Sequence, residues 1–93
     1  MSKNVEDFLG FLATEKGASE HTVKNYGIDL REFGKFIAEK DFKDLTYLDI
    51  RSFLAFLKTR DYSKSSISRK LACLRSFFKY LVRENILTQN PAA

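Results

Sequence analysis

Apolar residues return every three or four positions along most of the chain, which is the spacing of one face of an α-helix. The pattern predicts four helices, over residues 3–16, 19–39, 46–61 and 63–84. The last has the clearest seam, formed by Ile67, Leu71, Leu74, Phe78 and Leu81. No segment alternates as a half-buried strand does, so the sequence predicts an all-α domain built from four helices.

Capping residues stand where these helices should begin and end. Ser19, Thr46 and Ser63 each precede a periodic segment, and a hydroxyl there accepts a free N–H of the first turn. Gly17 follows the first segment, at a position where glycine is favoured because it readily adopts the left-handed conformation. Asn90-Pro91 prevents the helix from continuing at the other end of the chain.

Two glycines, Gly27 and Gly34, lie on one face of the second predicted helix. A glycine inside a helix costs about 1 kcal/mol relative to alanine. We therefore expect another helix to approach this face closely.

The composition fits one small intracellular domain. The chain has 93 residues and a single cysteine, Cys73, which cannot form an internal disulfide and which we expect to be half-buried. A lone cysteine favours a reducing compartment such as the cytoplasm. The first residues lack the apolar core of a signal peptide, and no apolar run approaches the roughly 20 residues of a membrane span.

Positive charge is concentrated in the second part of the chain. Residues 1–57 carry 8 Lys/Arg and 10 Asp/Glu, whereas residues 58–93 carry 8 Lys/Arg and 2 Asp/Glu. A basic half on a small domain suggests a polyanionic partner, although a solvated helix surface has the same composition.

No catalytic constellation is visible. The single histidine, His21, and the single cysteine are far apart in sequence and lack a motif, and His21 is either solvated or a phosphate contact. The chain has no glycine-rich phosphate loop, no paired-cysteine zinc spacing and no nucleophile elbow. We expect no catalytic residue, no metal and no cofactor.

Basic residues follow the polar faces of two predicted helices. On the fourth helix, an arc away from the apolar seam holds Ser65, Arg69, Arg75, Ser76, Lys79 and Arg83 and no acidic residue, and Lys70 flanks the seam on its other side. On the second helix, Lys24, Arg31 and Lys35 form a stripe. Two such faces can contact one duplex together.

Hydroxyl groups cluster at the starts of the same two helices. Free backbone N–H groups and the helix dipole attract phosphate there, and Lys64 extends that reach. Capping alone accounts for Ser19 and Ser63. Beyond the cap, Ser65 and Ser66 are either DNA contacts or simply exposed.

The sequence resembles the tyrosine recombinases, the family of phage integrases and Xer-type enzymes. Residues 17–33 resemble the family pattern G-x-S-x-x-T-x-x-x-Y-x-x-D-L-x-x-F. Residues 46–54 are similar to its third-helix run, and residues 63–78 to its S-x-x-S-x-x-R-x-L-x-x-L-R-S-F-Y run. Each pattern is weak alone, but they occur in order over nearly the whole chain.

The resemblance implies a SAM-like core-binding domain, an orthogonal bundle of four helices that forms half of a clamp around double-stranded DNA. Residues 1–93 would be this single domain, without the catalytic domain, and residues 85–93 would begin the linker. The second and fourth helices would approach the major groove. The implied DNA contacts are His21, Thr22, Lys24, Asn25, Lys64, Ser65, Ser66, Arg69 and Lys70, with Arg75 as a second-tier candidate whose alternative role is support of packing.

Family chemistry uses a tyrosine nucleophile in a second domain, so this segment is not itself an enzyme. We expect Tyr26 and Tyr80 at the core or its edge, and Tyr47 and Tyr62 at helix starts. Other recombinase protomers on the DNA are the expected protein partners. The competing interpretation is a SAM-like protein-interaction module, and it rests on Phe11, Phe56 and Phe77, which we expect to be exposed.

Overall fold

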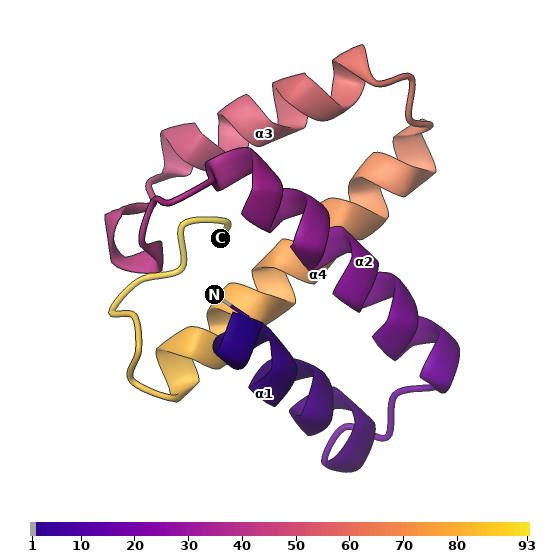
Figure 1. Ribbon diagram of the computed structural model, residues 1–93, viewed down its shortest axis with the longest axis vertical. Helices are drawn as coiled ribbons and strands as arrows, with labels where there is room; N and C mark the ends of the chain where they lie inside the picture. Colours follow the sequence, from indigo (N-terminus) through magenta and orange to yellow (C-terminus); the bar gives the residue numbers. More distant parts are fainter. Residues whose placement is uncertain (1) are drawn as a thin grey trace.

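The computed structural model describes residues 2–93 and consists of four α-helices and one turn of 3-10 helix (Figure 1). Their bounds are α1 (Ser2–Thr14), α2 (Glu20–Ile37), η1 (Phe42–Asp44), α3 (Tyr47–Thr59) and α4 (Lys64–Arg83). No strand occurs within residues 2–93. The predicted all-α class and the four helices are confirmed, with ends that differ from the predicted ones by one or two residues. None of the described helices is both long enough and apolar enough to span a bilayer.

The helix ends form as the capping residues indicate. The hydroxyls of Ser19 and Ser63 accept the backbone N–H groups of the third residues after them, each at 3.1 Å. Before α3, the Asp49 carboxylate accepts the backbone N–H of Thr46 at 2.8 Å, which is one half of a capping box. Gly17 has a φ of 62°, so the left-handed turn after α1 is where the sequence predicts it.

The bundle is organised around the crossing of α2 and α4, which pass over each other near the middle of the molecule (Figure 1). The segment α1 lies beside one half of this cross, and α3 lies beside the other half. Both α2 and α4 begin on the right-hand edge of the view. Their first turns therefore lie on the same side of the domain, that of α4 near the top of the view and that of α2 near the bottom.

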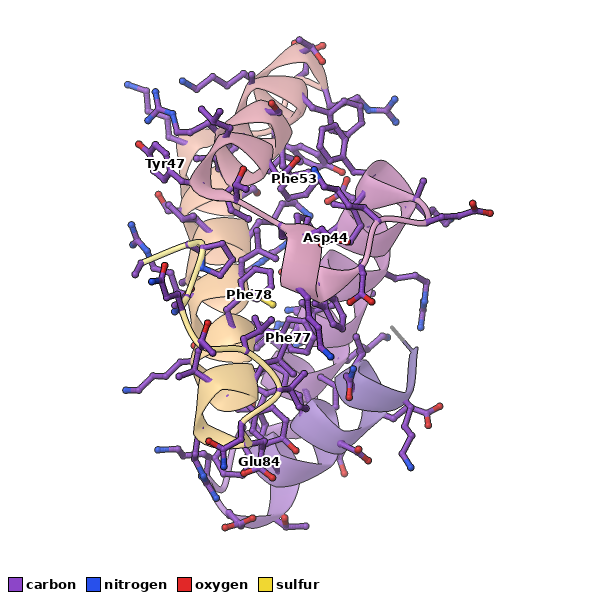
Figure 2. The ribbon with its side chains drawn as sticks, turned by 90° about the vertical axis from the view of Figure 1, so that its left-hand side faces the viewer. Asp44, Tyr47, Phe53, Phe77, Phe78 and Glu84 are labelled. Atoms are coloured by element: carbon purple, nitrogen blue, oxygen red, sulfur yellow. The ribbon has the colours of Figure 1, made fainter. Side chains whose placement is uncertain are left out.

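The core is a stack of aromatic rings between the helices. Phe33 packs edge-on against Phe53 and Phe78, with ring centres 5.0 and 5.9 Å apart. Figure 2 shows Phe53, Phe77 and Phe78 inside the bundle. Phe8 packs edge-on against Phe77 at 5.4 Å, which joins α1 to the same stack.

Four residues are more buried than the sequence analysis predicts. Phe77 is fully buried, because Phe8 and Phe42 cover the side of α4 that lies beyond its apolar seam. Cys73 is fully buried rather than half-buried, because it faces the crossing, where its thiol lies 3.7 Å from the Tyr26 carbonyl oxygen. Phe11 and Phe56 are half-buried and pack against the core. Tyr26 and Tyr80 also border the core, as predicted.

Gly27 is a point of close helix contact, as predicted. A Cβ atom at this position would lie 3.3 Å from Cδ1 of Leu9 in α1, which is tighter than ordinary packing. The absence of a side chain therefore lets α1 and α2 approach each other.

The segment after α4 folds back over the domain. Leu87 and Ala92 are buried, and the Arg75 side chain donates a hydrogen bond to the Ala92 carbonyl at 3.0 Å. The Asn90 side chain donates to the Arg75 carbonyl at 3.3 Å. Residues 85–93 thus contribute to the packed surface of this domain.

Candidate nucleic-acid interface

A buried carboxylate on α2 binds two cations of α4 at the helix crossing. The Asp29 side chain is only 2% exposed. Its Oδ1 accepts hydrogen bonds from Lys70 Nζ at 2.8 Å and from Arg69 Nη2 at 3.0 Å, and its Oδ2 accepts from Arg69 Nε at 3.2 Å. Because a buried charge is costly without partners, these contacts fix how α2 and α4 cross.

Lys70 belongs to the interior, and the expectation that it contacts DNA was wrong. Its side chain is 5% exposed. Nζ forms an ion pair with Glu32 Oε1 at 2.7 Å and lies 4.7 Å from the centre of the Tyr62 ring. Burial alone would lower the pKa of Lys70, but Asp29 and Glu32 outweigh it and raise that pKa.

Glu32 completes this cluster on the side of α3. Its Oε2 accepts the Tyr62 hydroxyl at 2.6 Å. Burial opposes ionisation of Glu32, but its contacts with Lys70 and Tyr62 outweigh burial and hold the pKa of the carboxyl below its ordinary value. The same hydrogen bond raises the pKa of Tyr62.

Arg69 differs from Lys70 in that its side chain is 45% exposed. Two of its five N–H groups bind Asp29, through Nε and Nη2. Of the remaining three, two lie on the edge formed by Nη1 and Nη2, and the third, on Nη1, points back toward Cδ. The hydrogen bond to Asp29 raises the pKa of Arg69, so the group stays charged. Arg69 is thus both attached to the core and available to a ligand.

The first turns of α2 present small polar groups. The Asn25 amide lies 3.1 Å from His21 Nε2, and the Ser19 hydroxyl donates to the Thr22 hydroxyl at 3.1 Å. Asn25 and Thr22 are half-buried, and His21 is exposed. Lys24 is exposed and about 100° around the helix from Asn25, so it borders this polar strip.

The first turn of α4 presents hydroxyl groups and one lysine. The hydroxyl oxygen of Ser63 lies 3.2 Å from that of Ser65 and 3.1 Å from that of Ser66. Lys64 and Ser65 are exposed. Free N–H groups of a helix start, hydroxyls and a cation together suit a phosphate oxygen.

Arg75 lies on a different side of α4. It is six residues beyond Arg69, which places it about 120° around the helix. It is exposed and holds the C-terminal segment through the Ala92 carbonyl. Arg75 and Arg69 therefore mark the two ends of the predicted basic arc, and the bond to Ala92 favours the packing role that was the alternative for Arg75.

Further cations border a groove between α1, α2 and α4, which has a volume of about 500 Å³. Thr22 and Tyr26 line it from α2, and Lys79 and Arg83 line it from α4. Arg83 lies 4.6 Å from the centre of the Phe11 ring. The groove adds positive charge next to the polar start of α2.

Sequence reasoning missed the role of Asp29. The available signal was an acidic residue between Tyr26 and Leu30 on the apolar face of a helix, where a charge requires a partner. Within residues 2–93, no three His, Cys, Asp or Glu side chains converge as metal ligands would.

A family profile described as the phage integrase N-terminal SAM-like domain matches residues 5–85. Similar curated proteins include tyrosine recombinase XerC of Listeria innocua, 40% identical over 87 residues, which are 90% of this chain and 29% of that protein. XerC of Halalkalibacterium halodurans is 41% identical over 90 residues, covering 94% of this chain and 30% of that protein. XerC of Natranaerobius thermophilus is 41% identical over 97 residues, covering 100% of this chain and 32% of that protein. The chain spans about a third of the length of these relatives.

Proposed function

Because the chain belongs to the phage integrase N-terminal SAM-like domain family, we propose that it is the DNA-binding module of a tyrosine recombinase. In this proposal it forms one half of a clamp on duplex DNA, and the first halves of α2 and α4 face the DNA. The contacts are His21, Thr22, Lys24, Asn25, Lys64, Ser65, Ser66 and Arg69.

The observation that carries the proposal is the joining of two polar helix starts through one buried ion cluster. Asp29 attaches Arg69 of α4 to the middle of α2, so the two starts are held on the same side of the domain (Figure 1). Each start combines a capping serine with exposed polar side chains. Such a surface suits the phosphates and base edges of a groove.

The strand-exchange chemistry of such an enzyme, in this proposal, belongs to the part of its relatives that this chain does not span. The tyrosines described above support this assignment. Burial raises the pKa of Tyr26 and of Tyr80, and the bond to Glu32 raises that of Tyr62. A lowered pKa is one way to activate a nucleophilic tyrosine, and these three tyrosines have the opposite shift. Other protomers of the recombinase are the protein partners on DNA.

A salt titration of duplex binding tests the proposal. Half of a clamp should bind at about 10⁻⁴ to 10⁻⁶ M at physiological salt. If about four phosphates are neutralised, the logarithm of the affinity should fall with the logarithm of the salt concentration at a slope of about −3.6. A slope near zero by fluorescence anisotropy contradicts a phosphate-based interface.

Matched charge variants locate the interface. Lys24 is exposed beside the polar strip, whereas Lys40 is paired with Asp49 at 3.1 Å before α3, and Lys43 lies in η1. Lys24→Ala should weaken binding by about 1 kcal/mol. Lys40→Ala and Lys43→Ala should change it little, because salt screens distant surface charges beyond about 10 Å. Equal losses in all three variants would mean that only net charge matters.

A second candidate function is protein interaction through the start of α3. Leu48 is 72% exposed and Tyr47 is 57% exposed, and Figure 2 shows Tyr47 at the outer surface. An NMR titration with duplex DNA distinguishes the two functions. Shifts at residues 21–25 and 64–69 support the DNA interface, whereas shifts confined to residues 47–56 contradict it.

A further inference from the structure

Arg69 is held by Asp29 in a way that leaves one edge of its guanidinium free. Asp29 occupies the edge formed by Nε and Nη2. The adjoining edge, formed by Nη1 and the second N–H of Nη2, keeps its N–H groups, and the side chain is 45% exposed. Two parallel N–H groups of this kind match two adjacent acceptors.

Asp29 is itself held in position by Lys70. Lys70 donates to the same Oδ1 that Arg69 Nη2 contacts, at 2.8 Å. Glu32 and Tyr62 in turn hold Lys70. Since Asp29 and Lys70 are almost fully buried, neither can turn toward solvent, and the orientation of Arg69 follows from theirs.

The charges of this cluster balance. Asp29 and Glu32 carry two negative charges, and Arg69 and Lys70 carry two positive charges, so the cluster exerts little long-range attraction on phosphates. What the cluster supplies is a fixed direction for hydrogen bonds. A fixed direction matters for reading the edge of a base, and it matters much less for attracting the phosphate backbone of the DNA.

We infer that Asp29 and Arg69 form a sequence-reading pair, in which Asp29 positions Arg69 so that its free edge donates to the N7 and O6 acceptors of a guanine in the major groove. This inference rests on the proposed function and adds to it the base that is read and a positioning residue. Guanine alone presents two adjacent acceptors on its major-groove edge, and arginine matches them with two N–H groups.

The test is selection of duplexes from a randomised pool by the full chain, followed by sequencing. Four variants are compared with the unsubstituted protein. Asp29→Asn frees Arg69, and Arg69→Lys keeps the charge but removes the paired N–H groups. Glu39→Gln removes the same charge as Asp29→Asn at an exposed position outside the ion cluster. Lys79→Ala removes an exposed cation on the same helix.

We expect the unsubstituted protein to enrich a guanine at one position. The enrichment should disappear in Asp29→Asn and in Arg69→Lys, and should persist in Glu39→Gln and Lys79→Ala. Replacing that guanine by 7-deazaguanine, which lacks the N7 acceptor, should weaken binding of the unsubstituted protein about tenfold and leave binding of Arg69→Lys nearly unchanged. If Asp29 had a purely structural role, its replacement would not change how much affinity the protein loses when N7 of the guanine is removed.

Results that contradict the base-reading inference can be told apart from results that contradict the proposed DNA binding. If Asp29→Asn retains the same guanine preference, Asp29 does not position Arg69. If the protein binds duplexes in a salt-dependent way but enriches no guanine, the base reading is wrong and the DNA-binding proposal stands. If it binds no duplex, the proposed function itself fails. If Asp29→Asn does not fold, Arg69→Lys and the 7-deazaguanine duplex still decide whether Arg69 reads a guanine.

Discussion

Replacement of Lys70 by methionine should destabilise the domain more than any replacement of an exposed lysine. The side chain of Lys70 is 5% exposed, and its ammonium contacts both Asp29 and Glu32. Methionine preserves most of the volume and length of lysine but removes the charge. Asp29 would then keep Arg69 as its only cation, and Glu32 would keep only the hydroxyl of Tyr62.

The expected loss of unfolding free energy follows from which buried charges lose a partner. Removing one partner of a buried ion pair costs about 3–5 kcal/mol, because the other charge stays buried. Arg69 still compensates Asp29 in part, so we expect about 3 kcal/mol. A small domain has a free energy of unfolding of about 5–15 kcal/mol. For a domain of this size, about 3 kcal/mol corresponds to a fall in Tm of roughly 12–24 °C.

Urea unfolding followed by far-UV circular dichroism measures the change. Lys79→Met is the matched control, since Lys79 lies on the same helix, is exposed and should change the free energy of unfolding by no more than about 0.5 kcal/mol. If Lys70→Met costs less than about 1 kcal/mol, the ion cluster does not hold the helix crossing. The reasoning about Asp29 and Arg69 would then lose its basis.

Three further outcomes are expected. The contribution of the cluster to stability depends on pH in two directions: the lowered pKa of Glu32 means that it declines as the pH falls below about 4.5, and the raised pKa of Lys70 means that it is lost as the pH rises above about 10.5. The difference in unfolding free energy between the unsubstituted protein and Lys70→Met should therefore be largest between roughly pH 5 and 10. Burial raises the pKa of Cys73 to about 12, so its thiol should react with iodoacetamide at neutral pH only when the domain opens, and fast labelling of the folded protein would contradict its placement. Arg75→Ala removes the hydrogen bond to Ala92, so amide hydrogen exchange should accelerate in residues 87–92 and stay unchanged in α2. An unchanged exchange rate in residues 87–92 would show that Arg75 does not hold this segment.

The sequence was sufficient for the helices because their determinants are local. A capping serine or a left-handed glycine acts within one turn, so Ser19, Ser63 and Gly17 could be interpreted without knowledge of the fold. Periodicity also identified the seam of α4. It did not reveal that a second side of α4 is covered, which is why Phe77 was expected at the surface.

The candidate site was harder to predict because its key contacts are distant in sequence. Arg69 and Lys70 are neighbours in the chain, and a helical wheel cannot tell which of them enters the interior. Only the position of Asp29, 40 residues away, decides this. Charge and motif patterns thus led to the proposed interface on α2 and α4, whereas the division of roles between adjacent cations required the crossing itself.

The dual position of Arg69 links DNA binding to the stability of the fold. An arginine that only decorated the surface would be removed at little cost in stability, but Arg69 shares a buried carboxylate with Lys70. Its loss would leave Asp29 with one cation, so Arg69→Ala should weaken the helix crossing as well as the interface. A ligand that binds the crossed arrangement and not the unfolded chain must stabilise that arrangement in return. DNA bound at Arg69 should therefore raise the Tm of the domain, and this gain should shrink in Asp29→Asn, where the guanidinium is no longer coupled to the core.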